Sequence, residues 1–545
     1  MLDRAAVHDP RPPPQTEGLH RRCDLLGSRG GRDRPRHACG VETLEQLSGT
    51  RQGSRVVVVI VEQLARTAVH LVRGSGGAED LRGEAAAVHP DHRLEAGARD
   101  VDAALRECEL PRIDPGADRV DQGAVEVEDD RFGTVGWLHR SYDTEPMPSE
   151  LAVHWTLDPG VTFLNHGSFG AAPRAVLAAQ DEWRRRMERE PVAFFAHDLE
   201  PALDDARAAL GAFLGADPDD LAFVTNATTG INIVARALRL SPGDEVVLLD
   251  HAYPAARNAL QAVADEAGAK LVTARIGFPG ATAEEAQHSV LAAVSPRTRL
   301  VMLDQVTSPT ALVLPVAEMV AALAERGVGT LVDAAHAPGM LDVDLASVGA
   351  AYTTGNCHKW MYAPKGSAFL HVRRDVQDRV RPLVISHGAT SARTDRSRFR
   401  LEHDWTGTLD PTPWLTVPAA IAFGDGLVPG GWPALRERGH RLAVAARDRL
   451  CAALGVATPA PDSMIGAMVS LPLATTSEPR PSGTYADRVH AALLAVGIQV
   501  AISGWPQQPD RRPWRRLVRL SCAPYVDMDD VEALTAALRS VLVAA

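Results

Sequence analysis

From residue 162 onward, short apolar segments alternate along the chain with amphipathic segments of helical length. Glu245–Leu249 and Lys270–Ala274 have the length and composition of buried strands, and Pro254–Ala267 between them has the apolar spacing of a helix. Strands that alternate with helices form a mainly parallel sheet covered on both faces, because parallel strands need long crossover connections. The sequence therefore predicts an α/β fold. Further strands are predicted at 221–225, 300–303, 330–332 and 351–354, and further helices at 175–189, Leu199–Leu214 and 228–238.

The pattern changes after Pro411, where long helical segments precede a few separate strands. A chain of 545 residues is also longer than one hydrophobic core usually spans. We therefore expect a large domain over residues 171–410 and a smaller α+β domain over 411–545, with segment 147–170 packing against the small domain. The elements predicted for the small domain are helices 419–423 and 432–454 and strands 467–471 and 517–521.

Residues 1–146 differ in composition from the rest of the chain. They are rich in Arg, Asp, Gly, His and Pro, and their aromatic residues are Phe132, Trp137 and Tyr142. Such a segment buries too little apolar surface to offset the entropy lost on ordering. It is either a disordered extension or a spurious reading of GC-rich DNA upstream of a true start at Met147; a small extra domain is the weakest alternative. We assign no function to it.

The overall composition excludes several classes of partner. A net charge of −12 and a pI near 5.9 argue against nucleic acid and acidic membrane surfaces. The six cysteines have no paired spacing, so we expect neither disulfides nor a metal site and place the protein in the reducing cytoplasm. The longest apolar run, residues 56–61, is too short to span a bilayer.

The ends of two predicted strands carry the residues with the clearest chemistry. Asp333 and His336 follow one strand, and Lys359 follows the next. Only three of the 57 Lys and Arg residues are lysines, so a lysine between His358 and Trp360 indicates a task that arginine cannot perform. A guanidinium stays protonated, whereas a buried amine can lose its proton and form an imine with an aldehyde. These residues point to pyridoxal phosphate (PLP), with Asp333 paired to the pyridinium nitrogen.

Two other strand ends could complete a cofactor site. Thr228 and Thr229 open a predicted helix, where free N–H groups favour a phosphate; a plain threonine N-cap is the alternative. His251 and Tyr253 follow the next strand and could set a ring against a flat cofactor, or could simply form a surface turn. Each signal alone is weak, and their order along the chain gives them weight.

Five sequence motifs lie at these strand ends and at turns near them. They are Phe163-Leu-Asn165-His166-Gly-Ser-Phe-Gly170, Thr225-Asn-Ala-Thr-Thr-Gly230, Asp333-Ala-Ala-His-Ala-Pro-Gly339, His358-Lys359-Trp360 with Pro364-Lys-Gly366, and Trp405-Thr-Gly-Thr408 with Asp410-Pro411. With these motifs the chain resembles the fold type I PLP enzymes of the class V aminotransferase family, and within it the isopenicillin N epimerase-like group. The resemblance covers residues 162 to the C-terminus. It implies a mainly parallel seven-stranded sheet in the large domain, a smaller α+β C-terminal domain, and a homodimer with sites shared between subunits.

The resemblance also implies a role for each site residue. Lys359 would hold PLP through an imine and shuttle the Cα proton, Asp333 would contact the pyridine nitrogen, and His336 would contact the 3′-oxygen. The phosphate would be bound by Thr228, the backbone N–H of Thr229, Asn356 and His358, and the phosphate of the neighbouring subunit by Thr408. The cofactor ring would be stacked by Tyr253 or His251. The substrate α-carboxylate would be bound by Arg519, and the substrate mouth would be lined by Asn165 and His166.

The expected reaction starts from an amino acid or a derivative of one, through an external aldimine and Cα deprotonation, as in an isopenicillin N epimerase-like enzyme. A C–S lyase of the hercynylcysteine sulfoxide lyase type ranks second and an aminotransferase third. A catalytically inactive PLP-fold binding protein is least favoured, because a degenerate site tends to lose its lysine. Persulfide chemistry is disfavoured, since Cys357 lies between expected phosphate ligands and Cys522 closely follows Arg519.

The composition of residues 1–146 generates the first prediction. A chain that begins at Met147 is expected to keep the thermal stability and turnover of the full chain, because the removed segment adds little apolar surface to any core. Thermal denaturation and activity of the two chains, measured side by side, check this. A large loss of either property would show that the leading segment is a working part.

Overall fold

The computed structural model describes residues 149–476, 478–481, 485–507 and 513–543, all of which belong to one compact unit, Trp137–Ala545. The predictions made for residues 1–146 lie outside the described residues. In the part of the chain that is described, no helix has the length and apolar character needed to cross a bilayer. The same residues contain no cluster of three or more His, Cys, Asp or Glu side chains that could hold a metal ion.

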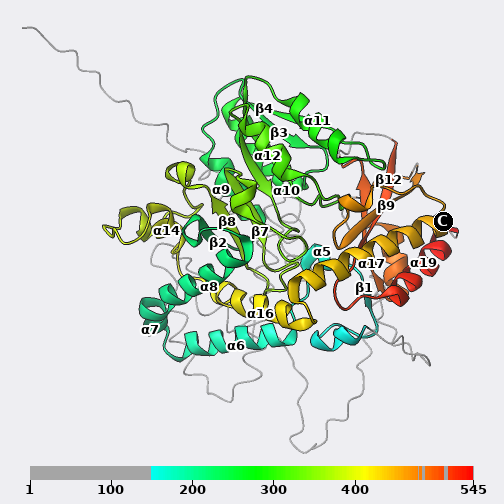
Figure 1. Ribbon diagram of the computed structural model, residues 1–545, viewed down its shortest axis with the longest axis horizontal. Helices are drawn as coiled ribbons and strands as arrows, with labels where there is room; N and C mark the ends of the chain where they lie inside the picture. The colour runs from blue at the N-terminus through cyan, green and yellow to red at the C-terminus, as the bar shows by residue number, and fades with distance from the viewer. Residues whose placement is uncertain (1–148, 477, 482–484, 508–512, 544–545) are drawn as a thin grey trace, which may run out of the picture. The chain divides into compact units, whose positions relative to one another are not determined.

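A seven-stranded sheet forms the centre of the large domain (Figure 1). Its strand order is β2-β8-β7-β6-β5-β3-β4, and β8 is antiparallel to both of its neighbours while the other pairs are parallel. This arrangement agrees with the predicted α/β class. The strands are β2 (Leu221–Val224), β3 (Glu245–Leu249), β4 (Lys270–Ala274), β5 (Thr298–Asp304), β6 (Gly329–Asp333), β7 (Tyr352–Asn356) and β8 (Ala368–Val372).

Apolar residues of the central strands face both sides of this sheet. In β3, Val246 and Leu248 join the apolar cluster formed with helices α9 (Ala227–Ala237) and α10 (Pro254–Ala267). Val247 and Leu249 join the opposite cluster, formed with α8 (Leu199–Leu214), α11 (Ala283–Ala293) and α12 (Val316–Ala324). Burial on both faces explains why these strands form continuous apolar runs in the sequence.

Local signals in the sequence set the ends of the helices. Helix α10 begins with Pro254, whose missing N–H costs nothing at a first helical position, and it ends at Gly268 with φ +66°. Helix α11 begins after Thr282, whose hydroxyl accepts a hydrogen bond from the Glu285 N–H at 3.1 Å. The other α-helices before residue 411 are α5 (His166–Phe169), α6 (Arg174–Arg189), α7 (Pro191–Ala193), α13 (Leu345–Val348) and α14 (Arg398–His403).

The C-terminal part of the chain forms a smaller α+β layer. Its three-stranded antiparallel sheet has the order β11-β12-β9, with β12 in the centre. Figure 1 shows this sheet in orange beside α17 and α19. The elements are α15 (Thr412–Leu415), α16 (Val417–Leu427), α17 (Gly431–Leu454), β9 (Met468–Thr476), α18 (Arg488–Leu494), β10 (Ile498–Gln499), β11 (Ala501–Trp505), β12 (Trp514–Ser521) and α19 (Met528–Val543).

The first described segment is joined to this C-terminal part. Strand β1 (Thr162–Phe163) pairs in parallel with β10, and the Ser521 N–H donates to the Leu164 carbonyl at 2.9 Å. These bonds fix the start of α5 beside the end of β12. Residues more than 300 positions apart in the chain therefore meet at one point, which also borders the lysine described below.

Most of the elements predicted from periodicity are present, with shifted ends. The strands predicted at 300–303 and 330–332 extend to Asp304 and Asp333, because each buried acid still takes part in the sheet register. Strand β8 has no counterpart among the strands predicted from residue patterns. It runs antiparallel to its partners β2 and β7, so it lacks the helical crossover that marked the other strands.

Candidate active site

The carboxyl ends of β6 and β7 bring Asp333, His336 and Lys359 together. Asp333 is the last residue of β6, and its Oδ1 accepts the Ala335 N–H at 3.0 Å. The Lys359 Nζ lies 3.3 Å from His336 Nε2, and both Asp333 and His336 are buried. The charges of Asp333 and Lys359 also act on each other's pKa. The three side chains thus meet in one partly buried space, as a single aromatic ligand would require.

Burial sets the protonation of this cluster. Desolvation, followed by the positive charge of Arg519, lowers the pKa of Lys359 to about 7, while Asp333 opposes the shift. Desolvation also lowers the pKa of His336 well below its usual range, so its imidazole is neutral. The His336 Nδ1 is buried without a hydrogen-bond partner in the described structure. A large share of the amine is therefore a nucleophile near neutral pH, next to an imidazole with a free polar atom.

The N-terminus of α9 lies beside the end of β7. Asn226 caps the helix by accepting the Thr229 N–H at 2.9 Å, and Asn356 Oδ1 accepts the Ala227 N–H at 2.8 Å. The Thr229 N–H that was expected to bind phosphate is therefore already bonded, whereas the Thr228 hydroxyl has no partner among the described residues. Asn356 therefore positions the start of α9. Its expected contact with the phosphate stays a prediction.

His358 lies in the loop that follows β7 and directly precedes the lysine. Its Nδ1 donates to the Ser367 carbonyl at 2.8 Å, because a carbonyl can only accept. Desolvation lowers the pKa of His358 to about 4. The Nε2 atom can donate to a phosphate only in the protonated ring, so an anion bound there would have to raise this pKa.

The two candidates for ring stacking have different environments. His251 is fully buried, with Nδ1 2.7 Å from Thr310 Oγ1 and Nε2 3.1 Å from the Ile276 carbonyl. Its ring packs edge-on against Trp505 at 4.4 Å between centroids. Both nitrogens of His251 are therefore bonded within the protein, and its ring is packed in the core. Tyr253 is 43% exposed and remains the residue with a free ring face.

The expected substrate-mouth residues lie deeper than the sequence suggested. His166 is fully buried, its Nδ1 is 2.8 Å from Tyr525 Oη, and its Nε2 donates to the Lys359 carbonyl at 3.0 Å. His166 therefore supports the backbone of Lys359 from behind and does not line an opening. Asn165 is also buried, and its Oδ1 accepts the Ser168 hydroxyl at 2.6 Å.

The loop before α6 approaches the lysine segment closely at Gly170, where a side chain would not fit. Its φ is +61°, and an added Cβ would lie 2.4 Å from the His358 carbonyl oxygen and 3.1 Å from Lys359 Cα. A side chain at this position would collide with backbone that cannot give way. The glycine of this motif is thus explained by its contact with the lysine segment.

Arg519 enters the same space from β12. Its Nη1 donates to the Ser308 carbonyl at 2.6 Å and its Nη2 to Ser168 Oγ at 2.9 Å, while its Nε is buried without a partner. No carboxylate forms an ion pair with Arg519 in the described part of the chain. A buried cation without a counter-charge is costly unless an anion arrives, so this guanidinium is suited to a carboxylate ligand.

Thr408 is exposed on the loop after α14. No described contact joins it to Asp333, His336 or Lys359 within this chain. Its expected contact with a neighbouring subunit's phosphate therefore stays a prediction.

Sequence reasoning missed Asp304, which ends β5 and pairs in register with Asp333. It is buried, its Oδ2 has no partner among the described residues, and it receives the Tyr253 backbone N–H. Desolvation, followed by the nearby Asp333 charge, raises its pKa well above the usual value. An acid at the end of an apolar strand was the same signal that identified Asp333, so this residue could have been found.

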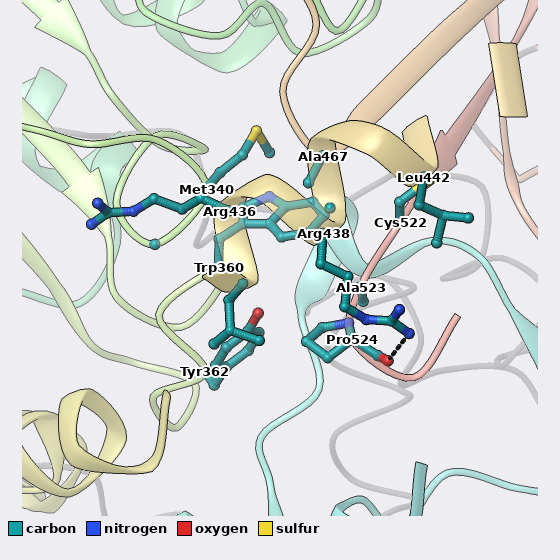
Figure 2. A pocket seen from close by; sticks show the side chains of 13 residues that line it. Met340, Trp360, Tyr362, Arg436, Arg438, Leu442, Ala467, Cys522, Ala523 and Pro524 are labelled. Atoms are coloured by element: carbon teal, nitrogen blue, oxygen red, sulfur yellow. Dashed lines mark hydrogen bonds between the residues drawn. The ribbon is translucent and has the colours of Figure 1, made fainter. Parts of the chain in front are cut away.

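A small cavity beside Trp360 is separate from these residues (Figure 2). It lies where α17 meets the segment after β12, and Figure 2 shows Arg438 reaching the Pro524 carbonyl, at 3.0 Å. None of the expected site residues lines it. We therefore regard it as a packing gap behind the lysine segment.

Comparison with known proteins agrees with this geometry. The profile of the family "Aminotransferase class-V" matches residues 166–534. The chain is 37% identical over 399 residues to isopenicillin N epimerase of Amycolatopsis lactamdurans, which covers 70% of this chain and 96% of that protein. It is 34% identical over 333 residues to putative L-cysteine desulfhydrase 1 of Oryza sativa subsp. japonica, covering 58% of this chain and 68% of that protein.

Among solved structures, a C-DES mutant with glycine covalently linked to the PLP cofactor has a TM-score of 0.57 and 22% identity, covering 69% of this chain and 96% of that one. The similarity supports the fold. The protein belongs to the class V aminotransferase family of PLP-dependent, fold type I enzymes, and it has isopenicillin N epimerase among its homologues. Its cofactor is pyridoxal 5′-phosphate.

The lowered pKa of Lys359 generates the second prediction. Only the neutral amine attacks an aldehyde, so uptake of PLP by the apo-protein should rise with pH with a midpoint near 7. Arg519→Gln removes a positive charge that lowers this pKa, so the midpoint should move to higher pH. Stopped-flow absorbance after PLP addition, over a pH series, measures both.

Arg515→Gln is the matched control, because Arg515 lies on the same strand and does not act on the pKa of Lys359. The assignment would be contradicted by a midpoint near 10.5, the ordinary lysine value, in the unmodified protein.

Proposed function

We propose that the protein acts on an amino acid or an amino-acid-derived substrate and removes its Cα proton, as an isopenicillin N epimerase-like enzyme does. The observation that carries the proposal is a half-buried amine, Lys359, with a pKa lowered to about 7, beside Asp333, His336 and a buried Arg519 that has no carboxylate partner among the described residues. Strongly shifted pKa values of grouped buried side chains are typical of catalytic sites.

The residues present fit PLP. The unpartnered Nδ1 of His336 and the unpartnered hydroxyl of Thr228 supply polar atoms that the described part of the protein does not satisfy. The N-terminus of α9 supplies the positive end of a helix dipole for a phosphate. When bound, PLP supplies an electron sink that makes the Cα–H of an attached amino acid acidic.

The protein's own side chains would then have separate tasks. Lys359 Nζ would hold the cofactor and afterwards take the Cα proton, which its lowered pKa allows near neutral pH. Asp333 would keep the pyridine nitrogen protonated, and burial strengthens that contact because water does not screen it. Arg519 would bind the substrate α-carboxylate through both of its terminal nitrogens. His166 would keep the Lys359 backbone in place through its 3.0 Å hydrogen bond.

Elimination at a C–S bond is the second candidate. The similarity to an L-cysteine desulfhydrase favours it, and such a reaction needs little more than Lys359 and a leaving group. A lyase of the hercynylcysteine sulfoxide lyase type belongs to this candidate. An aminotransferase ranks third, since no motif suggests a second half-reaction with a keto acid, and an inactive binding protein ranks last.

Persulfide transfer is not supported by Cys357 or Cys522, the two cysteines near the expected site residues. Cys357 is fully buried and desolvation raises its pKa to about 12, while Cys522 is buried and its pKa is also raised by desolvation. A thiol that takes sulfur from a substrate must be mobile and must ionise. Neither of these two residues meets that condition.

We also propose that the protein acts as a homodimer with sites shared between subunits. Thr408 is exposed and lies outside the lysine space of its own chain, in a loop that begins after α14. An exposed threonine hydroxyl there is available to the phosphate of a neighbouring subunit.

Replacement of the lysine is the third prediction. Lys359→Ala should fold normally, because one strand-end side chain is lost, but it should form no yellow chromophore that borohydride bleaches and should lose nearly all turnover. Absorbance spectra before and after borohydride, with thermal denaturation, measure the effect. Lys365→Ala, which removes the other lysine of this segment, should keep the chromophore. Full turnover by Lys359→Ala would refute the role of this amine.

Isotope exchange separates the two candidate reactions and forms the fourth prediction. The PLP-loaded protein is incubated with a panel of L-amino acids in D₂O. Deuterium at Cα with inversion of configuration is expected for the epimerase-like reaction, because both faces of Cα must exchange a proton. Release of pyruvate and ammonia would instead support the lyase. A yellow protein that gives neither exchange nor release with any substrate would contradict the proposed function.

A further inference from the structure

Few aromatic side chains of the described residues are exposed. Across the described residues, Phe169, Tyr253 and Tyr485 are the only exposed aromatic side chains, with 63%, 43% and 43% of their surface open. The remaining described Phe, Tyr and Trp side chains are buried or half-buried. Large exposed rings that gather in one place mark binding surfaces more often than chance.

Two of these rings, Phe169 and Tyr485, are linked to each other and, through Ser168, to Arg519. Phe169 follows Ser168, whose Oγ accepts the hydrogen bond from Arg519 Nη2 at 2.9 Å. Tyr485 stacks on Phe169, with ring centroids 6.4 Å apart and planes at 30°. Tyr485 and Tyr253 are also the two groups whose charge would raise the pKa of Arg519, so both hydroxyls lie within electrostatic reach of it.

Tyr253 differs from the other two rings in its anchoring. Its backbone N–H is bound to Asp304, next to Asp333 in the sheet, so it belongs to the cofactor side of the site. Phe169 and Tyr485, here called the aromatic pair, come from α5 and from the segment before α18. The pair is therefore linked to the Arg519 guanidinium through Ser168, the residue before Phe169.

We propose that the aromatic pair binds the side chain of the substrate, and that the substrate is an amino acid with an aromatic or extended apolar side chain. This inference rests on the proposed function, because it takes the carboxylate on Arg519 as the fixed point. A ring or long apolar chain that starts from that point covers the open faces of Phe169 and Tyr485 and removes apolar surface from water. A short polar side chain, such as that of serine or cysteine, would leave both rings exposed to water.

A pair of simple carboxylates tests the inference without turnover. Neither 3-phenylpropionate nor propionate has an amino group, so each can occupy the Arg519 position without reacting at the cofactor. Calorimetric titration of the PLP-loaded protein should give a dissociation constant about tenfold lower for 3-phenylpropionate, as expected when part of a phenyl ring is buried. Equal affinities for the two carboxylates would overturn the proposal.

Variants test whether the aromatic pair causes the preference for 3-phenylpropionate over propionate. Phe169→Ala combined with Tyr485→Ala should reduce the preference to below about threefold, whereas Tyr485→Phe keeps a ring and should retain it. Leu494→Ala, an exposed apolar side chain of α18, is the matched control and should change nothing. Arg519→Gln should weaken both ligands. An unchanged preference in the double variant, or binding that ignores Arg519→Gln, would refute the proposal.

The outcome is separable from that of the proposed function. Loss of the 3-phenylpropionate preference in a protein that still exchanges the Cα proton would refute only the substrate class. A protein that never exchanges a Cα proton, yet binds 3-phenylpropionate through Phe169 and Tyr485, would refute only the proposed reaction.

Discussion

The partial removal of one amine from water is the interaction on which the rest of this site depends. Lys359 is half-buried beside the ends of β6 and β7 and the loop that contains Gly170, and desolvation is the largest cause of the lowering of its pKa. A lysine at the surface would carry a proton near neutral pH and could not react with an aldehyde. The glycine at 170 and the imidazole of His166 are needed because they allow the chain to close around that amine.

The second condition is that charges from separate parts of the chain meet at this amine. Parallel strands place their carboxyl ends at one edge, so Asp304, Asp333 and the start of α9 lie together without long loops. Arg519 comes from the small antiparallel sheet. The pairing of β1 with β10 holds the start of α5 beside the end of β12, the strand that carries Arg519. The candidate site therefore requires both folded layers, because Lys359 and Asp333 come from one layer and Arg519 comes from the other.

Strong, repeated patterns in the sequence predicted the architecture well. Continuous apolar runs identified β3 and β4, and helical apolar spacing identified α10, Pro254–Ala267, to the residue. The strand-end rule also selected Asp333 and Lys359, which the structure brings together. The same rule was applied too narrowly, since Asp304 carries the identical signal one strand away. Strand β8 gave no such signal, because its antiparallel pairing leaves no helical crossover in the sequence.

By itself the sequence determined the class of fold, the cofactor, and the order in which the strand ends follow each other, because apolar periodicity and residue type are local properties. Only the tertiary structure decided which polar residues face the ligand space. His166 and His251 look like site residues in the chain, yet both are enclosed with both nitrogens bonded, while Ser168 and Phe169 acquire their importance from Arg519, some 350 positions away. Burial and the direction of a side chain depend on contacts between distant segments, and no local pattern records them.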